Sequence, residues 1–196
     1  MFAAELEKKW HEHARSMTMI RDILMYMDRI YVPPNELEPV YDLGLSLWRD
    51  VVLRDPSVNS RMRAFVLDAI DTERRGDSFD VAAVTDVTRM TMDVGEDVYV
   101  SDVETHVLAS TSEFYKNESE SLLSSGDCFS YLTAVEKRLA EEVNRCGTYL
   151  HKRTERFLVK RCETELLEKP AHVVLGLPNS GLKRYVLHFP NPGLPV

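Results

Sequence analysis

Two segments of this sequence contain residue types that could do chemistry, and the first is His11-Glu12-His13. Imidazole nitrogens are common zinc ligands. On a helix, however, side chains two positions apart point roughly 200° away from each other, so these two rings cannot share one metal ion. The spacing also differs from the H-E-x-x-H pattern of zinc enzymes. We interpret both histidines as solvent-exposed helix residues and expect no metal site.

The second segment covers residues 176–183, GLPNSGLK, and partly matches a phosphate-binding loop. That loop requires a lysine directly after its second glycine, followed by a serine or threonine. Leu182 stands where the lysine is needed, and Arg184 follows Lys183. Ser180 also lacks the flanking glycine of a nucleophile elbow. We therefore predict a turn here, with no bound cofactor and no catalytic serine.

The three cysteines, Cys128, Cys146 and Cys162, form no C-x-x-C pair. An odd number at this spacing is typical of a reducing compartment, where a thiol is most often a small packing residue. Cys146 lies on an apolar helix stripe, which favours packing over catalysis. We therefore predict no catalytic residue among the cysteines.

Composition limits the classes of partner. The 196 residues are 44% hydrophobic, which is enough for one globular domain, and they carry 24 basic against 32 acidic side chains, a net charge of −8. A chain that tracks nucleic-acid phosphates or anionic lipid normally has the opposite excess, so we expect neither partner. The start of the sequence turns charged within five residues, without a signal-peptide core, and we expect the protein in the cytoplasm and nucleus.

Apolar residues recurring every three or four positions predict seven helices and an all-α bundle or α-solenoid. The expected ranges are 2–32, about 35 to the break at Asp55, 58–75, 81–93, about 102 to the turn at 124–127, 128–150 and 155–168. Asp80 is the expected amino-terminal cap of the fourth helix, Gly76 the stop of the third, and Ser101 to Glu104 a capping box for the fifth. Residues 98–100 are one of the few short pieces of strand type.

The expected buried stripes follow from the same spacing. In the first helix the stripe contains Phe2, Leu6, Trp10, Met17, Ile20, Leu24, Met27 and Tyr31. In the second it contains Val40, Leu43, Leu47 and Val51, and in the sixth Leu132, Val135, Leu139, Val143, Cys146 and Leu150. The outer face of the sixth helix is expected to carry the ion pairs Lys137–Glu141 and Glu141–Arg145.

One face of the first helix is not explained by this stripe. Asp22, Met25, Tyr26 and Arg29 lie three or four positions apart and are displaced from it. A methionine and a tyrosine bordered by charged residues are typical of a protein–protein interface. The pattern alone fits equally well a helix that is buried on two sides within its own chain.

An eleven-residue block, MIRDILMYMDR at 19–29, resembles cullins, specifically the class that binds BTB-domain adaptors and most of all its plant members. Shorter matches extend the resemblance over about residues 2–183. They are KWHEH at 9–13, GLSLWRD at 44–50, ERRG at 73–76, SEFYK at 112–116, EKRL at 136–139 and NSGL at 179–182. The resemblance implies the cullin-repeat α-solenoid. Cullins are scaffolds of multisubunit ubiquitin ligases, in which the first five-helix repeat holds the adaptor through its second and fifth helices.

Aligned with this pattern, residues 1–32 correspond to the last helix of cullin repeat one, 33–152 to repeat two, 153–183 to the start of repeat three, and 184–196 to a divergent irregular tail. Asp22, Met25, Tyr26 and Arg29 are then the expected adaptor-binding residues. The first four helices of repeat one and the half that holds the RING subunit have no counterpart here, so we expect no direct RING contact.

The resemblance implies a non-catalytic scaffold subunit, or a fragment of one, that binds a BTB-type adaptor in ubiquitin-dependent protein degradation. The alternative is a truncated cullin that is inert or competes for adaptors without assembling a ligase. An enzyme is not expected, because no residue cluster indicates catalysis.

Overall fold

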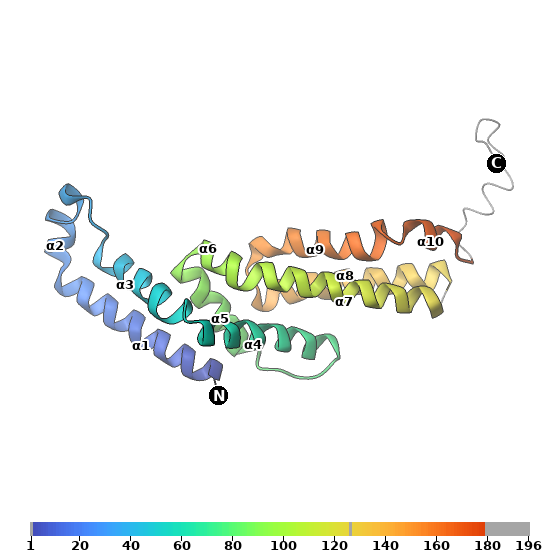
Figure 1. Ribbon diagram of the computed structural model, residues 1–196, viewed down its shortest axis with the longest axis horizontal. Coiled ribbons are helices and arrows are strands. Elements are labelled where there is room, and N and C mark those ends of the chain that lie inside the picture. The colour runs from blue at the N-terminus through green and yellow to red at the C-terminus, as the bar shows by residue number, and fades with distance from the viewer. Residues whose placement is uncertain (1, 126, 179–196) are drawn as a thin grey trace. The chain divides into compact units, whose positions relative to one another are not determined.

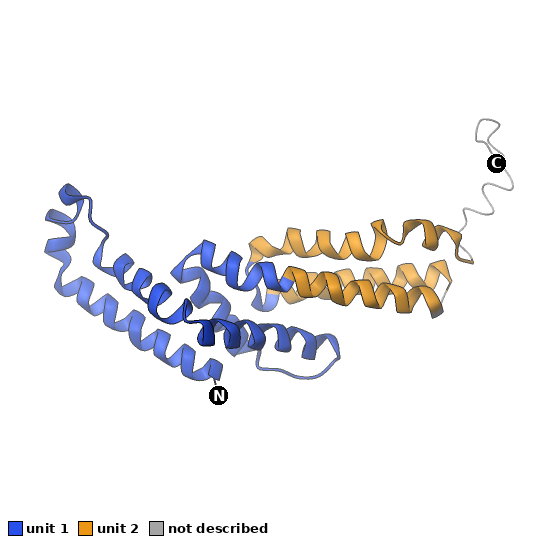
Figure 2. Ribbon diagram, viewed as in Figure 1, with its two compact units in different colours: residues 1–107, 148–151 blue, residues 108–147, 152–196 orange. Residues whose placement is uncertain are grey.

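The computed structural model describes residues 2–125 and 127–178, and every regular element within them is a helix (Figure 1). The predicted all-α fold is therefore confirmed. Two compact units divide the chain, one of residues 1–107 with 148–151 and the other of residues 108–147 with 152–196 (Figure 2). In the described part of the chain, no helix combines the length and the apolar character needed to cross a membrane.

The helices follow one another with short breaks. In chain order they are α1 (Phe2–Ile23), α2 (Met25–Ile30), α3 (Val40–Trp48), α4 (Pro56–Arg74), α5 (Val81–Val94), α6 (Glu96–Tyr99), α7 (Thr105–Ser125), α8 (Cys128–Tyr149), α9 (Glu155–Glu163) and α10 (Ala171–Gly176). π-helical turns follow α3, α6 and α9, at Arg49–Leu53, Val100–Glu104 and Thr164–Glu168. Short 3-10 turns lie at Pro33–Asn35 and Lys152–Thr154.

Local side chains and backbone geometry set several helix ends. The Asp80 carboxylate accepts the Ala83 amide at 3.1 Å and caps α5, as predicted. Gly76 adopts a φ of 87° just after α4, a conformation that glycine tolerates best, so its predicted role as a stop is confirmed. Asp55 caps the start of α4 by accepting the amides of Ser57 and Val58.

The capping box expected at Ser101 is wrong. The helical run begins instead at Glu96, after the extended residue Gly95, and continues through a π-helical turn into α7. The Ser101 hydroxyl donates to the Val98 carbonyl at 3.2 Å, a bond within a helix rather than at its start. Residues 98–100, expected as a strand-like piece, are helical, because they belong to the helical run that begins at Glu96.

In the first unit, α1 packs against α3 and α5. Trp10 and Trp48 are buried with ring centroids 5.4 Å apart, and His13 lies 5.1 Å from Trp48. Nε2 of His13 donates to the Gly44 carbonyl at 2.8 Å. His13 is therefore half-buried and structural, so its predicted full exposure is wrong, whereas His11 is exposed as expected.

The buried face of α3 also differs from the prediction. Leu43, Leu47 and Val51 are 46%, 50% and 70% exposed. The residues that face the core are Val40, Gly44, Trp48 and Leu53. The helix begins at Val40 rather than near Asn35, and α1 approaches it at Gly44. In α4 the buried apolar residues are Met62, Val66, Ala69 and Ile70.

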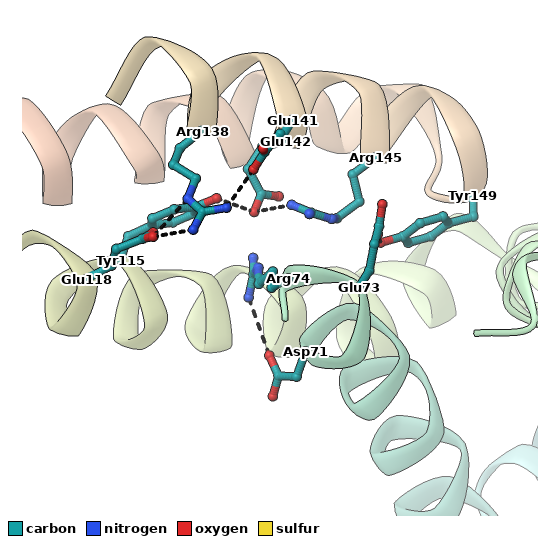
Figure 3. Close-up of polar contacts among 10 residues, drawn as sticks. All are labelled: Asp71, Glu73, Arg74, Tyr115, Glu118, Arg138, Glu141, Glu142, Arg145 and Tyr149. Carbon is teal, nitrogen blue, oxygen red and sulfur yellow. Dashed lines mark hydrogen bonds and ion pairs between the residues drawn. The ribbon is translucent and has the colours of Figure 1, made fainter. Parts of the chain in front are cut away.

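The second unit has a mixed core. Its apolar centre contains Tyr115, Cys128, Tyr131, Val135, Cys162, Leu166 and Val174. Tyr131 donates to the Leu166 carbonyl at 2.7 Å, which joins α8 to the segment after α9. Beside it, Arg145 and Glu142 are 3% and 0% exposed and form an ion pair at 2.5 Å, while the Tyr115 hydroxyl donates to Glu142 at 2.6 Å (Figure 3).

This network corrects the prediction for the sixth helix. Arg145 is buried rather than on the outer face, and Leu132 and Val143 are exposed. Tyr131 and Glu142 occupy the inner face together with the expected Val135 and Cys146. Lys137 and Glu141 form the expected outer pair at 3.8 Å. The opposite charges of Glu142 and Arg145 offset each other, and the Tyr115 hydroxyl adds a hydrogen bond to the carboxylate, which lowers the cost of burying this polar face.

Gly44 provides a test of the α1–α3 packing. A Cβ atom at this position would lie 2.6 Å from Cγ and Cε of Met17. Gly44→Ala should therefore destabilise the protein by roughly 1–3 kcal/mol through overpacking. The control, Gly147→Ala on the exposed side of α8, has nothing within 4 Å and should be neutral or stabilising. Urea titration followed by circular dichroism measures both, and equal stability of the two variants would contradict the close approach.

Candidate interaction surface

The predicted first helix is interrupted near its end. The chain forms α1 up to Ile23 and α2 from Met25, with Leu24 between them at φ −92° and ψ 10°. The predicted single helix over 2–32 is therefore wrong in this detail. Backbone bonds from Leu24 to the Ile20 carbonyl and from Asp28 to the Leu24 carbonyl still cross the junction. The chain therefore bends at Leu24 while its backbone hydrogen bonding continues across the junction (Figure 1).

The four residues predicted to form an interaction surface are all exposed. Tyr26 is 77% and Met25 47% exposed, and Asp22 and Arg29 also lie on the surface. Within the described residues, neither Tyr26 nor Arg29 makes a side-chain hydrogen bond or ion pair. Asp22 accepts from its neighbour Arg21 at 2.8 Å, an exposed pair that contributes little to stability.

The carboxyl-terminal part of the expected buried stripe is also exposed, so the prediction is wrong for these residues. Ile20, Leu24, Met27 and Tyr31 range from 36% to 56% exposed, whereas Leu6 and Trp10 are buried. The described residues that pack against α1 do so nearer its start, around Trp10 and Met17. The structure therefore does not separate a core face from an interface face in α2.

Three exposed apolar residues were missed from the sequence. Met19, Ile23 and Ile30 are 58%, 79% and 57% exposed. With Tyr26 they are spaced four, three and four positions apart, which places them along one helix face. That spacing was visible in the sequence. The stripe through Ile20 and Leu24 has the same period, however, so periodicity alone could not show which of the two sets is exposed. Together with the four predicted residues they make an apolar surface with a charged edge, which we call the α2 surface (Met19, Asp22, Ile23, Met25, Tyr26, Arg29 and Ile30).

One polar contact links α2 to α3, and a second closes the turn that follows α2. The Asp28 carboxylate accepts the Val40 amide at 3.1 Å, which serves as a remote cap because Pro39 offers α3 no side-chain cap. Asn35 donates to the Tyr31 carbonyl at 2.7 Å after the end of α2. Val32 is 5% exposed and anchors the connecting loop. The surface residues are thus held on a defined backbone.

The other candidates from the sequence are buried cysteines and a segment that lies mostly outside the described residues. Cys128, Cys146 and Cys162 are buried, and none of them is in a disulfide. Most of the 176–183 segment, from Asn179 onward, lies outside the described residues. Among the residues that are described, no three histidine, cysteine or carboxylate side chains gather as metal ligands would. Burial, followed by the charge of Arg63, lowers the pKa of His106, and the charge of Asp102 partly offsets this shift.

Asp28 tests how α2 is held. Asp28→Ala removes the acceptor of the buried Val40 amide, and we expect a local loss of about 1 kcal/mol, the usual cost of losing a cap. Hydrogen exchange at the Val40 amide should become roughly five- to tenfold faster. Asp22→Ala, which removes a carboxylate paired only with exposed Arg21, is the matched control and should leave that rate unchanged. Equal rates in the two variants would show that Asp28 does not cap α3.

Comparison with known proteins places the chain in a family. Residues 1–186 match the family described as "Cullin alpha solenoid domain". The chain is 40% identical to Cullin-3A of Arabidopsis thaliana over 95% of its own length and 26% of that protein. It is 38% identical to Cullin-3 of Dictyostelium discoideum over 92% of its length and 24% of that protein. It thus spans about a quarter of the length of these curated relatives. The match over nearly the whole chain shows that this protein belongs to the cullin family.

Proposed function

We propose that this chain is a non-catalytic scaffold segment of a cullin-RING ubiquitin ligase and that its α2 surface binds a BTB-domain adaptor. Similarity to proteins named Cullin-3 supports the scaffold role. The observation that carries the adaptor site is Tyr26, which is 77% exposed on a helix that Asp28 links to the start of α3. The protein acts in the cytoplasm and nucleus under this proposal.

The chemistry of the α2 surface suits a protein partner. Tyr26 offers a large and rigid ring with a hydroxyl, so it can fill a pocket and still form a hydrogen bond at the pocket's edge. Met25 beside it adapts to an irregular neighbouring surface. Arg29 at the edge can donate a charge-assisted hydrogen bond to a carboxylate of the adaptor. An exposed apolar patch of this kind on a soluble chain commonly marks a binding site.

The repeat assignment belongs to the same proposal. Residues 1–32 supply the last helix of repeat one, 33–152 form repeat two, and 153–183 begin repeat three. Under this assignment the RING subunit binds outside the segment described by this sequence. The adaptor therefore contacts the chain directly, whereas the RING subunit does not.

A truncated cullin that is inert, or that competes for adaptors without assembling a ligase, is the second candidate. A pull-down with a purified BTB adaptor and a RING subunit distinguishes the two. We expect recovery of the adaptor alone from the isolated chain. Recovery of neither protein would favour the inert chain, and recovery of both would contradict the assignment of the RING contact.

Tyr26→Ala tests the adaptor site. Removing a central aromatic anchor typically costs about 2 kcal/mol of binding. We therefore expect affinity for a BTB adaptor to fall at least about tenfold, equivalent to roughly 1.4 kcal/mol. The helical melt should be nearly unchanged because the ring is exposed. Isothermal titration calorimetry measures the affinity, in this chain and in one extended by a complete first repeat.

Phe129→Ala is the matched control for this experiment. Phe129 is 74% exposed on α8, far along the sequence from α2. The substitution therefore removes an aromatic ring that is as exposed as Tyr26 but lies outside the proposed site. The control should bind the adaptor as the unchanged chain does. If Tyr26→Ala keeps its affinity but melts at a lower temperature, the ring supports the fold and the proposed site is wrong.

A further inference from the structure

A short basic segment contrasts with the acidic chain. Residues 152–161 contain five lysines and arginines and one glutamate, although the chain as a whole has a net charge of −8. They cover the 3-10 turn Lys152–Thr154 and most of α9. All of them belong to the second unit. Such a local reversal of sign creates a positive potential on a negative molecule.

The helix geometry gathers these charges on one side. Lys152, Arg156 and Lys160 are spaced four positions apart and are exposed. Together they line one side of a shallow depression of about 760 Å³, whose remaining lining is Arg153, Glu155, Val159 and Glu163. We call this side of α9 the basic face (Lys152, Arg153, Arg156 and Lys160).

Two of these four cations are not neutralised locally. Within the described residues, neither Lys152 nor Arg156 forms an ion pair. The guanidinium of Arg156 instead lies over the Phe157 ring, 4.5 Å from its centroid. Lys160 pairs with Glu168 at 2.5 Å, and this hydrogen bond raises the pKa of the lysine and keeps it charged. The basic face therefore holds free cations that an acidic partner could neutralise.

The lining indicates the kind of partner. Glu155 and Glu163 stand among the cations, and their carboxylates would repel the continuous phosphates of a nucleic acid. Val159 adds an apolar contact in the floor of the depression. A peptide can place carboxylates against the cations and an apolar side chain against Val159. A lining that combines charged and apolar side chains therefore suits a peptide better than a nucleic acid.

We propose that the basic face of α9 docks an acidic segment of a partner protein that also carries an apolar side chain. This site is separate from the α2 surface in sequence and belongs to the other unit. It depends on complementary charge, so binding should weaken as salt is added. The proposal does not rest on the adaptor function, because its test contains no adaptor.

The test uses the 196-residue chain and a fluorescein-labelled octapeptide, Glu-Glu-Leu-Glu-Glu-Leu-Glu-Glu, followed by fluorescence anisotropy. We expect saturable binding that weakens with ionic strength. Lys152→Glu with Arg156→Glu should reduce affinity at least about tenfold by placing like charges opposite the peptide. Circular dichroism monitors the folding of each variant. If the glutamate variant unfolds, Lys152→Gln with Arg156→Gln replaces it, and we expect this variant to lose about threefold in affinity for the peptide.

The matched control is Lys8→Glu with Lys137→Glu, which makes the same change in net charge at exposed positions on α1 and α8. It should bind within about twofold of the unchanged chain. An equal loss in this control would show a general charge effect and overturn the proposal. Absence of peptide binding would overturn it too, as would tighter binding of a single-stranded RNA oligonucleotide than of the peptide.

Discussion

The close approach of α1 to α3 at Gly44 is the contact on which the presentation of the α2 surface depends. Met17 occupies the space that a side chain at position 44 would need, and the His13 ring donates to the Gly44 carbonyl at 2.8 Å. Buried Trp10 and Trp48 complete this contact. Because α1 is fixed here, its end and α2 carry their exposed residues on an anchored backbone. Asp28, which caps α3 from a distance, links α2 to α3 as well.

The two units differ in the large side chains that they bury. In the first unit Trp10, Trp48 and Met62 are buried together with many aliphatic side chains, such as Val66 and Ile70. The second unit instead buries the Glu142–Arg145 ion pair beside Tyr115 and Tyr131. Removing one member of a buried ion pair leaves an uncompensated charge, so such a face tolerates single substitutions poorly. These polar residues therefore constrain which helix face of α8 can turn inward.

The α2 surface and the basic face of α9 illustrate two kinds of recognition. The first exposes Tyr26, Met25 and Ile23, and its binding energy would come from burying apolar area. The second exposes cations around Val159, and its binding energy would come from charge, which salt screens. The match to the cullin family covers residues 1–186, whereas each surface consists of a few exposed residues within one unit. A cullin segment can in this way offer separate sites to partners of different chemistry.

The sequence by itself determined the helical class, the family resemblance and the caps at Asp80 and Gly76. Each of these depends on neighbours within one helical turn or on a continuous motif. Only the tertiary structure decided which of two equally periodic faces is buried, since Leu43 and Arg145 lie opposite to where periodicity put them. Periodicity counts apolar positions, but burial depends on what packs against them, such as the approach of α1 at Gly44 and the pairing of Arg145 with Glu142.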